Sequence, residues 1–121
     1  MINVKDQVYA ALLRVHDNVS DLYPSDWQRD FAIQYTEEAN DVYTKVDEVE
    51  SSSYLRFRID IWSTGNTSEI TLKVDKELSA LGLVRTGCAD TPDPSGRRHK
   101  QMRYEGIIDN ETQIVYWNGN R

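Results

Sequence analysis

The most regular feature of the sequence is the alternation of apolar and polar side chains across residues 54–62. Successive side chains of a β-strand point to opposite faces of its sheet. One face of this predicted strand is apolar and the other is charged and aromatic: Leu55, Phe57, Ile59 and Ile61 against Tyr54, Arg56, Arg58, Asp60 and Trp62. The first face predicts a core, and the second is either exposed to solvent or covered by a partner.

Other segments predict further strands around this one. Residues 31–38 alternate with the same period, and residues 83–89, 99–109 and 112–117 have strand composition. The acidic segment 39–53 has too few apolar residues for a central strand, so we predict a long hairpin or flap that joins two strands. Residues 19–27, interrupted by Pro24, predict a brief extended piece and a turn.

Two segments have helical spacing. In the first, Asn3 is predicted to cap a helix whose apolar stripe consists of Val4, Val8, Ala11, Leu12 and Val15. In the second, Asn66 and Glu69 resemble a capping box, and Gly82 stands where a left-handed C-terminal cap belongs. The stripe of this second helix consists of Ile70, Val74, Leu78 and Leu81.

The order of these elements predicts the fold class. Strands follow one another in groups instead of alternating with helices, which favours an α+β fold over a parallel α/β fold. We therefore predict a mostly antiparallel β-sheet with two α-helices packed on one face. The predicted domain covers residues 1–117, and residues 118–121 are predicted to form a flexible C-terminal tail.

The composition excludes several classes of protein. The 121 residues are 39% apolar and 28% charged, as in globular domains. No apolar run approaches the roughly 20 residues that span a bilayer, and the first residues lack the pattern of a signal peptide. A single cysteine, Cys88, fits a reducing compartment. We therefore expect a cytosolic chain without membrane contact.

Motifs for catalysis or metal binding are not found in the sequence. His16 and His99 do not form an HxxxH pair, and Cys88 has no CxxC partner. The sequences GxSxG, GxxxxGK[ST] and GxGxxG are also missing. The acidic residues between positions 37 and 50 lack apolar neighbours that would shift their pKa values. We expect neither an enzyme nor a bound cofactor or metal.

Charge is distributed unevenly along the chain. Residues 1–50 contain eleven acidic and four basic residues, a net charge of -7, whereas residues 51–121 have a net charge of +1. The basic residues gather after a proline loop, at Arg97, Arg98, Lys100 and Arg103 behind Pro92 and Pro94. A sequence pI of about 4.8 disfavours a dedicated nucleic-acid binder. The loop therefore predicts protein docking, for example against the acidic region of a neighbouring copy, unless both regions are only solvated surface.

Several segments in this order resemble a known family. They are VYAALLRV, VSDLYPSDW, FAIQYTEEAND, SYLRFRIDIWS, VDKELSALGLVRT and DTPDPSGRRHKQMRYEGIID. Together they cover roughly residues 1–117 and are similar to the small tail completion proteins, or tail terminators, of long-tailed bacteriophages and prophages. The strand YLRFRIDIW and the segment from ALGLVR to HKQMRYEG carry most of the resemblance.

The resemblance implies a structural protein with a sheet flanked by helices. Such proteins form a ring, commonly of six subunits, on the head-proximal end of the tail tube. The ring ends tail polymerisation and provides the surface for the head connector, while DNA passes through its lumen without being read. The implied partners are further copies of the chain, the major tail tube protein and the connector, and the implied location is the virion after assembly in the host cytoplasm.

These expectations assign roles to particular residues. The basic loop, with Pro92, Pro94, Arg97, Arg98, Lys100 and Arg103, is expected to dock on a neighbouring subunit or the tube. Glu37, Glu38, Glu48 and Glu50 are expected to line the lumen or face a partner. Trp62 is expected either to anchor an interface or to cover its strand. Two alternatives stay open: another neck protein, such as a head–tail adaptor or closure protein, and an unrelated cytosolic binding module.

Overall fold

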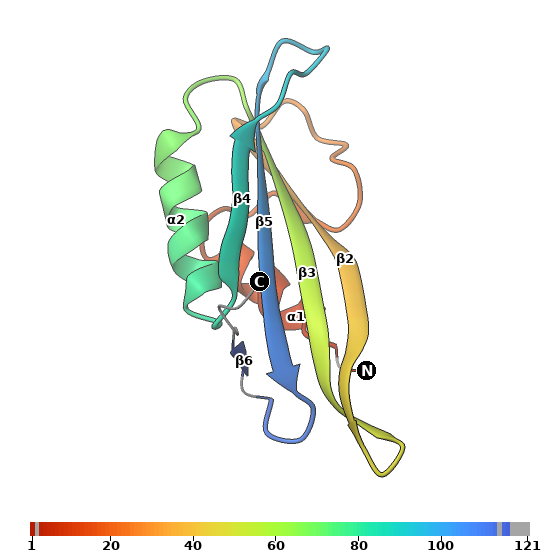
Figure 1. Cartoon of the computed structure of the whole chain (residues 1–121). Coiled ribbons are helices and arrows are strands. Elements are labelled where there is room, and N and C mark those ends of the chain that lie inside the picture. The colour runs from red at the N-terminus through yellow and green to blue at the C-terminus, as the bar shows by residue number, and fades with distance from the viewer. Residues whose placement is uncertain (2, 114, 117–121) are drawn as a thin grey trace.

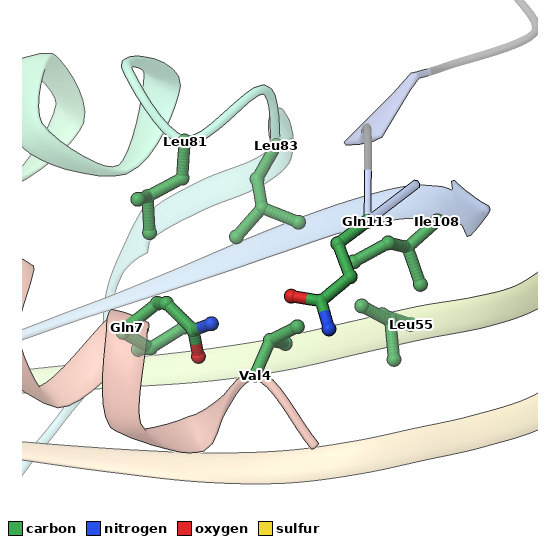
Figure 2. A pocket seen from close by; sticks show the side chains of 8 residues that line it. Val4, Gln7, Leu55, Leu81, Leu83, Ile108 and Gln113 are labelled. Atoms are coloured by element: carbon green, nitrogen blue, oxygen red, sulfur yellow. The ribbon is translucent and has the colours of Figure 1, made fainter. Parts of the chain in front are cut away.

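The computed structural model describes residue 1, residues 3–113 and residues 115–116, and it has an α+β fold (Figure 1). The predicted 118–121 tail and Trp117 lie outside the described residues. The elements are α1 (Lys5–Leu13), β1 (Val19–Ser20), β2 (Phe31–Val46), β3 (Val49–Ser63), α2 (Ser68–Ser79), β4 (Val84–Asp90), β5 (Arg98–Asp109) and β6 (Val115–Tyr116). The predicted fold class is confirmed.

The strands form one sheet in the order β1-β2-β3-β5-β4, and β6 pairs with β5. All pairs are antiparallel except β1 with β2, which is parallel. The predicted extended piece at residues 19–27 thus becomes a two-residue edge strand followed by a loop. The two longest strands, β2 and β3, are consecutive in sequence and form the longest ladder, while β3 and β5 lie at the centre.

One face of the sheet packs against the two helices (Figure 1). The apolar residues of β3 pair with alternate residues of β5, for example Phe57 with Tyr104 and Ile59 with Met102, and all four are fully buried. The helices add the predicted stripes, of which Val8, Leu12, Val74 and Leu78 are fully buried. The apolar face predicted from the alternation in residues 54–62 therefore forms the sheet side of the hydrophobic core.

The helix ends differ from the predicted caps. The N-cap positions are Val4 and Thr67 instead of Asn3 and Asn66, and neither makes a side-chain capping bond. Asn3 and Asn66 instead accept hydrogen bonds from the backbone N–H two residues later, at 3.0 and 2.8 Å. Short turns of this kind are a common use of Asn before a helix. The predicted capping box is thus wrong, whereas Gly82 has the predicted left-handed conformation, with φ of 93°.

The acidic segment 39–53 forms a hairpin, which is one of the two forms that we predicted for it. Its turn residues Asp47 and Glu48 both have positive φ, 52° and 67°, as a tight two-residue turn requires. β5 pairs with β3 only from Ser52 onward, so the tip of the hairpin is a two-stranded ribbon that extends beyond the rest of the sheet (Figure 1). A polar sequence can form this hairpin because the hydrogen bonds between its two strands come from backbone groups and not from side chains.

Candidate interaction surface

The face of the sheet opposite the helices, which we call the open face, carries the charged residues of β3. They pair with polar residues of β5: Trp62 with His99, Asp60 with Gln101, and Arg58 with Arg103. Two arginines thus stand directly opposite each other, an arrangement that is unfavourable without a counter-charge. The sequence predicted the polar alternation of β3, and the register of β5 completes the surface.

The counter-charge comes from Glu38 of β2. Glu38 follows Thr36 on the open face by the ordinary alternation of the strand, and its carboxylate lies 3.0 Å from Arg103, 3.4 Å from Arg58 and 3.3 Å from Arg56. The Glu38 side chain is 16% exposed, whereas the three arginine side chains are 31–42% exposed. One carboxylate therefore organises three partly exposed guanidinium groups.

Asp60 continues this network into the buried part of the face. Its carboxylate accepts hydrogen bonds from Arg58 at 2.9 Å, His99 Nε2 at 2.8 Å and Gln101 at 3.1 Å. Asp60 is only 3% exposed, so these donors replace the water that a carboxylate needs. Arg58 contacts both Glu38 and Asp60 and joins the two clusters into one network.

An aromatic cluster covers the end of the open face. The Trp62 ring stacks on His99 with centroids 4.4 Å apart and meets Trp27 and Tyr23 edge-on at 5.6 and 5.7 Å. Trp62 Nε1 donates a hydrogen bond to Asp93 at 3.2 Å. Tyr23 and Trp27 belong to the segment between β1 and β2, residues 21–30, which we call the covering loop.

Burial in this cluster decides between the two predicted roles of Trp62. Trp62 is 4% exposed, so it covers its strand and does not serve as an exposed interface anchor. The exposed aromatic side chain at this end is Tyr23, 66% exposed. Sequence reasoning missed the covering loop because its contacts with β3 join residues 35 or more positions apart.

The covering loop is also tied to the β4–β5 loop, residues 91–97. Arg97 lies over the Trp27 ring, 5.3 Å from its centroid, and donates a hydrogen bond to the Trp27 carbonyl at 2.6 Å. Within the β4–β5 loop, hydrogen bonds from the Ser95 hydroxyl and backbone, and from Trp62, lower the pKa of Asp93 below its ordinary value. The two loops therefore close over Trp62 together.

The predicted basic docking loop is divided by the structure. Only Pro92, Pro94 and Arg97 lie in the loop, because β5 begins at Arg98. The remaining residues alternate along β5: Arg103 is on the open face, and Lys100 pairs across the ladder with the core residue Ile61. Lys100 contacts Asp90 at 2.9 Å, and Arg103 contacts Glu38. Arg97 and Arg98 make no ion pair within the described residues, and of the two Arg98 is the exposed one.

The predicted acidic surface is also divided. Strand alternation places Glu37 opposite Phe57, on the helix side, and Glu38 on the open face. Glu48 lies in the exposed hairpin turn. Glu50 lies close to the hairpin turn, opposite Lys45, where the N-terminal amino group and the Ser53 hydroxyl lower the pKa of its carboxyl group. The four carboxylates therefore lie at separate places on the chain, and their position in a lumen or against a partner stays a prediction.

Comparison with known proteins does not assign this chain to a family. The chain matches no protein-family model, and no curated protein is significantly similar to it. Neither helix in the described part of the chain is long and apolar enough to span a membrane. Among residues 1, 3–113 and 115–116, no group of three or more His, Cys, Asp or Glu side chains is arranged to hold a metal ion.

Proposed function

We propose that this chain is a structural protein of phage assembly: a tail completion protein that forms a ring on the head-proximal end of the tail tube. The resemblance over roughly residues 1–117 and the α+β fold, with both helices on one side of the sheet, support this proposal. In this role the chain performs no chemical reaction. It ends tail polymerisation and provides the surface that joins the head connector.

The observation that carries the proposal is the position of two projecting segments at opposite ends of one sheet. The β2–β3 hairpin extends from one end, and the β4–β5 loop extends from the other (Figure 1). Different surfaces on one chain allow head-to-tail contacts between copies, and such contacts close into a ring when the rotation permits. The partners are other copies, six in the ring, together with the tube protein and the connector.

The charge of the chain is compatible with passage of DNA through such a ring. A net charge of -6 repels phosphates, so DNA would slide through the lumen without being held. Two of the basic side chains that could have held it, Lys100 and Arg103, are paired within the chain.

The test is direct visualisation of tail tubes mixed with the purified chain. Negative-stain images are expected to show a cap at one end of each tube, and native mass spectrometry is expected to show a hexamer-sized species alone or on the tube. Tubes that continue to grow in the presence of the chain would contradict the proposal. Binding to isolated head connectors without binding to tubes would favour a neck protein instead.

A further inference from the structure

The β2–β3 hairpin tip, residues 41–49, is the most exposed apolar region in the described part of the sheet. Val42, Tyr43, Val46 and Val49 are 51%, 45%, 61% and 67% exposed. The third strand, β5, ends its pairing at Ser52, so residues 45–50 around the turn pair only with each other and have no third strand beside them. An isolated two-stranded ribbon is at best marginally stable in water. A tip of this kind is therefore stabilised when something packs against it.

Polar contacts along the hairpin hold its tip in an extended position. Glu50 contacts the N-terminal amino group and Ser53, and Ser53 also donates a hydrogen bond to Asn110 at 2.7 Å. The Thr44 hydroxyl lies 2.6 Å from the hydroxyls of both Ser51 and Ser52. These contacts connect the ribbon to β5 and fix the direction in which it leaves the sheet.

The outer edges of the sheet are less suited to contacts between copies. β2 has register shifts at three places along its length, and β4 has one between Arg85 and Gly87. Such irregularities are a common protection against edge-to-edge pairing. Two of the β2 shifts lie within the hairpin tip, where they oppose strand pairing but leave the apolar side chains exposed.

The tip is acidic, with Asp41, Asp47 and Glu48 against the single cation Lys45. The complementary surface on the same chain is the outward side of α2. There Leu72 is 71% exposed. Lys73 follows it directly in the sequence, and Lys76 lies about one helical turn further along. Lys73 contacts Glu69 at 3.4 Å, and because this pair is exposed and weak, Lys73 can exchange Glu69 for another partner.

We propose that the hairpin tip of one chain docks on the outward side of α2 of a second copy. Val46 and Val49 would pack on Leu72, with Asp47 and Glu48 facing Lys73 and Lys76. The contact is heterologous, because the tip and α2 are different surfaces, and Figure 1 shows them on separate parts of the molecule. Each chain can therefore donate a tip and accept one at the same time, as a ring requires. This inference rests on the proposed function and adds the surfaces that join the subunits.

The test uses two charge-reversal variants. The tip variant carries Asp47→Lys and Glu48→Lys, and the helix variant carries Lys73→Glu and Lys76→Glu. Each variant alone is expected to self-associate at least about tenfold more weakly than wild type, because like charges then face each other. An equimolar mixture is expected to recover association, since the reversed tip matches the reversed helix and the native tip matches the native helix.

The readouts are native mass spectrometry and sedimentation of the chain alone, followed by counts of capped tubes. The matched control, Asp26→Lys with Asp30→Lys on the covering loop, changes the charge as much as the tip variant and should associate like wild type. A second pair compares Val49→Ser, expected to weaken association, with Leu22→Ser, a side chain that is 72% exposed and lies outside both surfaces.

Each result decides the inference. Weak association of each single variant, with association recovered only in the mixture, supports the heterologous contact. Equal association of all variants overturns it. If the chain is monomeric without tubes, the same variants are scored on capped tubes: full capping by both single variants overturns the inference but leaves the tail completion role intact. A wild-type chain that neither associates nor caps tubes contradicts the proposed function itself.

Discussion

The two faces of the sheet are made from alternate residues of the same strands, yet different forces hold them. On the helix side, Phe57 and Met102 are fully buried among apolar neighbours. On the open face, Asp60 is almost as buried but lies among Arg58, His99 and Gln101. The comparison teaches that burial alone does not identify a core. The apolar side depends on filled volume, whereas the open face depends on complete pairing of its charges.

The largest effect is expected from a cavity on the helix side. Phe57→Ala removes a fully buried ring and should lower the free energy of unfolding by about 3–5 kcal/mol. Urea denaturation followed by circular dichroism measures this loss. Val49→Ala, at a side chain that is 67% exposed, is the control and should change stability by less than about 0.5 kcal/mol. Similar losses for both variants would contradict the assignment of Phe57 to the core.

The matching experiment on the open face removes one buried carboxylate. Asp60→Ala leaves the donors of Arg58, His99 and Gln101 without their acceptor, so stability should fall by about 3 kcal/mol. Asp90→Ala is the control, because the Asp90 side chain is 84% exposed beside Lys100 and its loss should cost less than about 1 kcal/mol. If urea melts show equal costs, the open face is not held by its buried charges.

Alkaline pH should weaken the helix side. Burial, with the hydrogen bond that the Tyr104 hydroxyl donates to Asp75, raises the pKa of Tyr104 above its ordinary value. The unfolded chain ionises this tyrosine near pH 10, so its contribution is intact below pH 10 and is lost as the pH rises. One unit higher, about 1.4 kcal/mol should be gone.

This pH effect is measured by urea melts between pH 8 and pH 11. Tyr104→Phe lacks the ionisable group and is expected to be less stable at pH 8 but to lose less stability on the way to pH 11. Parallel curves for the variant and wild type would show that Tyr104 does not cause the alkaline loss. Tyr35 and Tyr54, whose pKa values are also raised by burial, are expected to give the remaining slope.

A smaller effect is expected where the two loops meet over Trp62. Arg97→Ala removes the hydrogen bond to the Trp27 carbonyl and the contact with its ring, and should cost about 1 kcal/mol. Limited proteolysis should then cut the covering loop faster. The adjacent Arg98→Ala is the matched control and should leave both stability and cleavage unchanged. Unchanged cleavage in Arg97→Ala would mean that Arg97 does not hold the loop.

The smallest effect on stability, combined with an effect on assembly, is expected from Arg98→Glu. Arg98 is the exposed cation of the predicted docking set, and its reversal should change stability by less than about 0.5 kcal/mol. If the β4–β5 end of the chain docks on a subunit or the tube, this variant should cap fewer tubes than wild type. Normal capping would remove Arg98 from the expected contact.

The alternation in residues 54–62 predicted which side chains of β3 form the core, and helical spacing predicted the stripes on both helices. Local backbone chemistry predicted the left-handed Gly82. These features depend on neighbours in the sequence, where periodicity and conformational preference act directly. The caps were mistaken by one residue because Asn can close a turn before a helix as well as cap it.

The pairing of the charged side chains could not be predicted from periodicity. Glu37 and Glu38 lie on opposite faces as alternation predicts, but the bulge after Glu37 places Ala39 opposite Arg56 and so reverses the faces of the residues that follow. Glu38 then meets Arg103, 65 positions away, and Trp27 meets Trp62, 35 positions away. A one-residue shift in a strand reverses the face of every later side chain. Periodic reading of the sequence cannot detect such a shift.

The sequence by itself determined the fold class, the apolar face of β3 and the concentration of acid in the first fifty residues. The tertiary structure decided that the open face pairs its own charges, that Trp62 is covered by the chain itself, and that the hairpin tip remains without a neighbour. The physical reason is the separation in sequence over which each kind of interaction acts. Side-chain periodicity records which face is apolar, but ion pairs and loop contacts depend on strand register and on segments brought together only when the sheet forms.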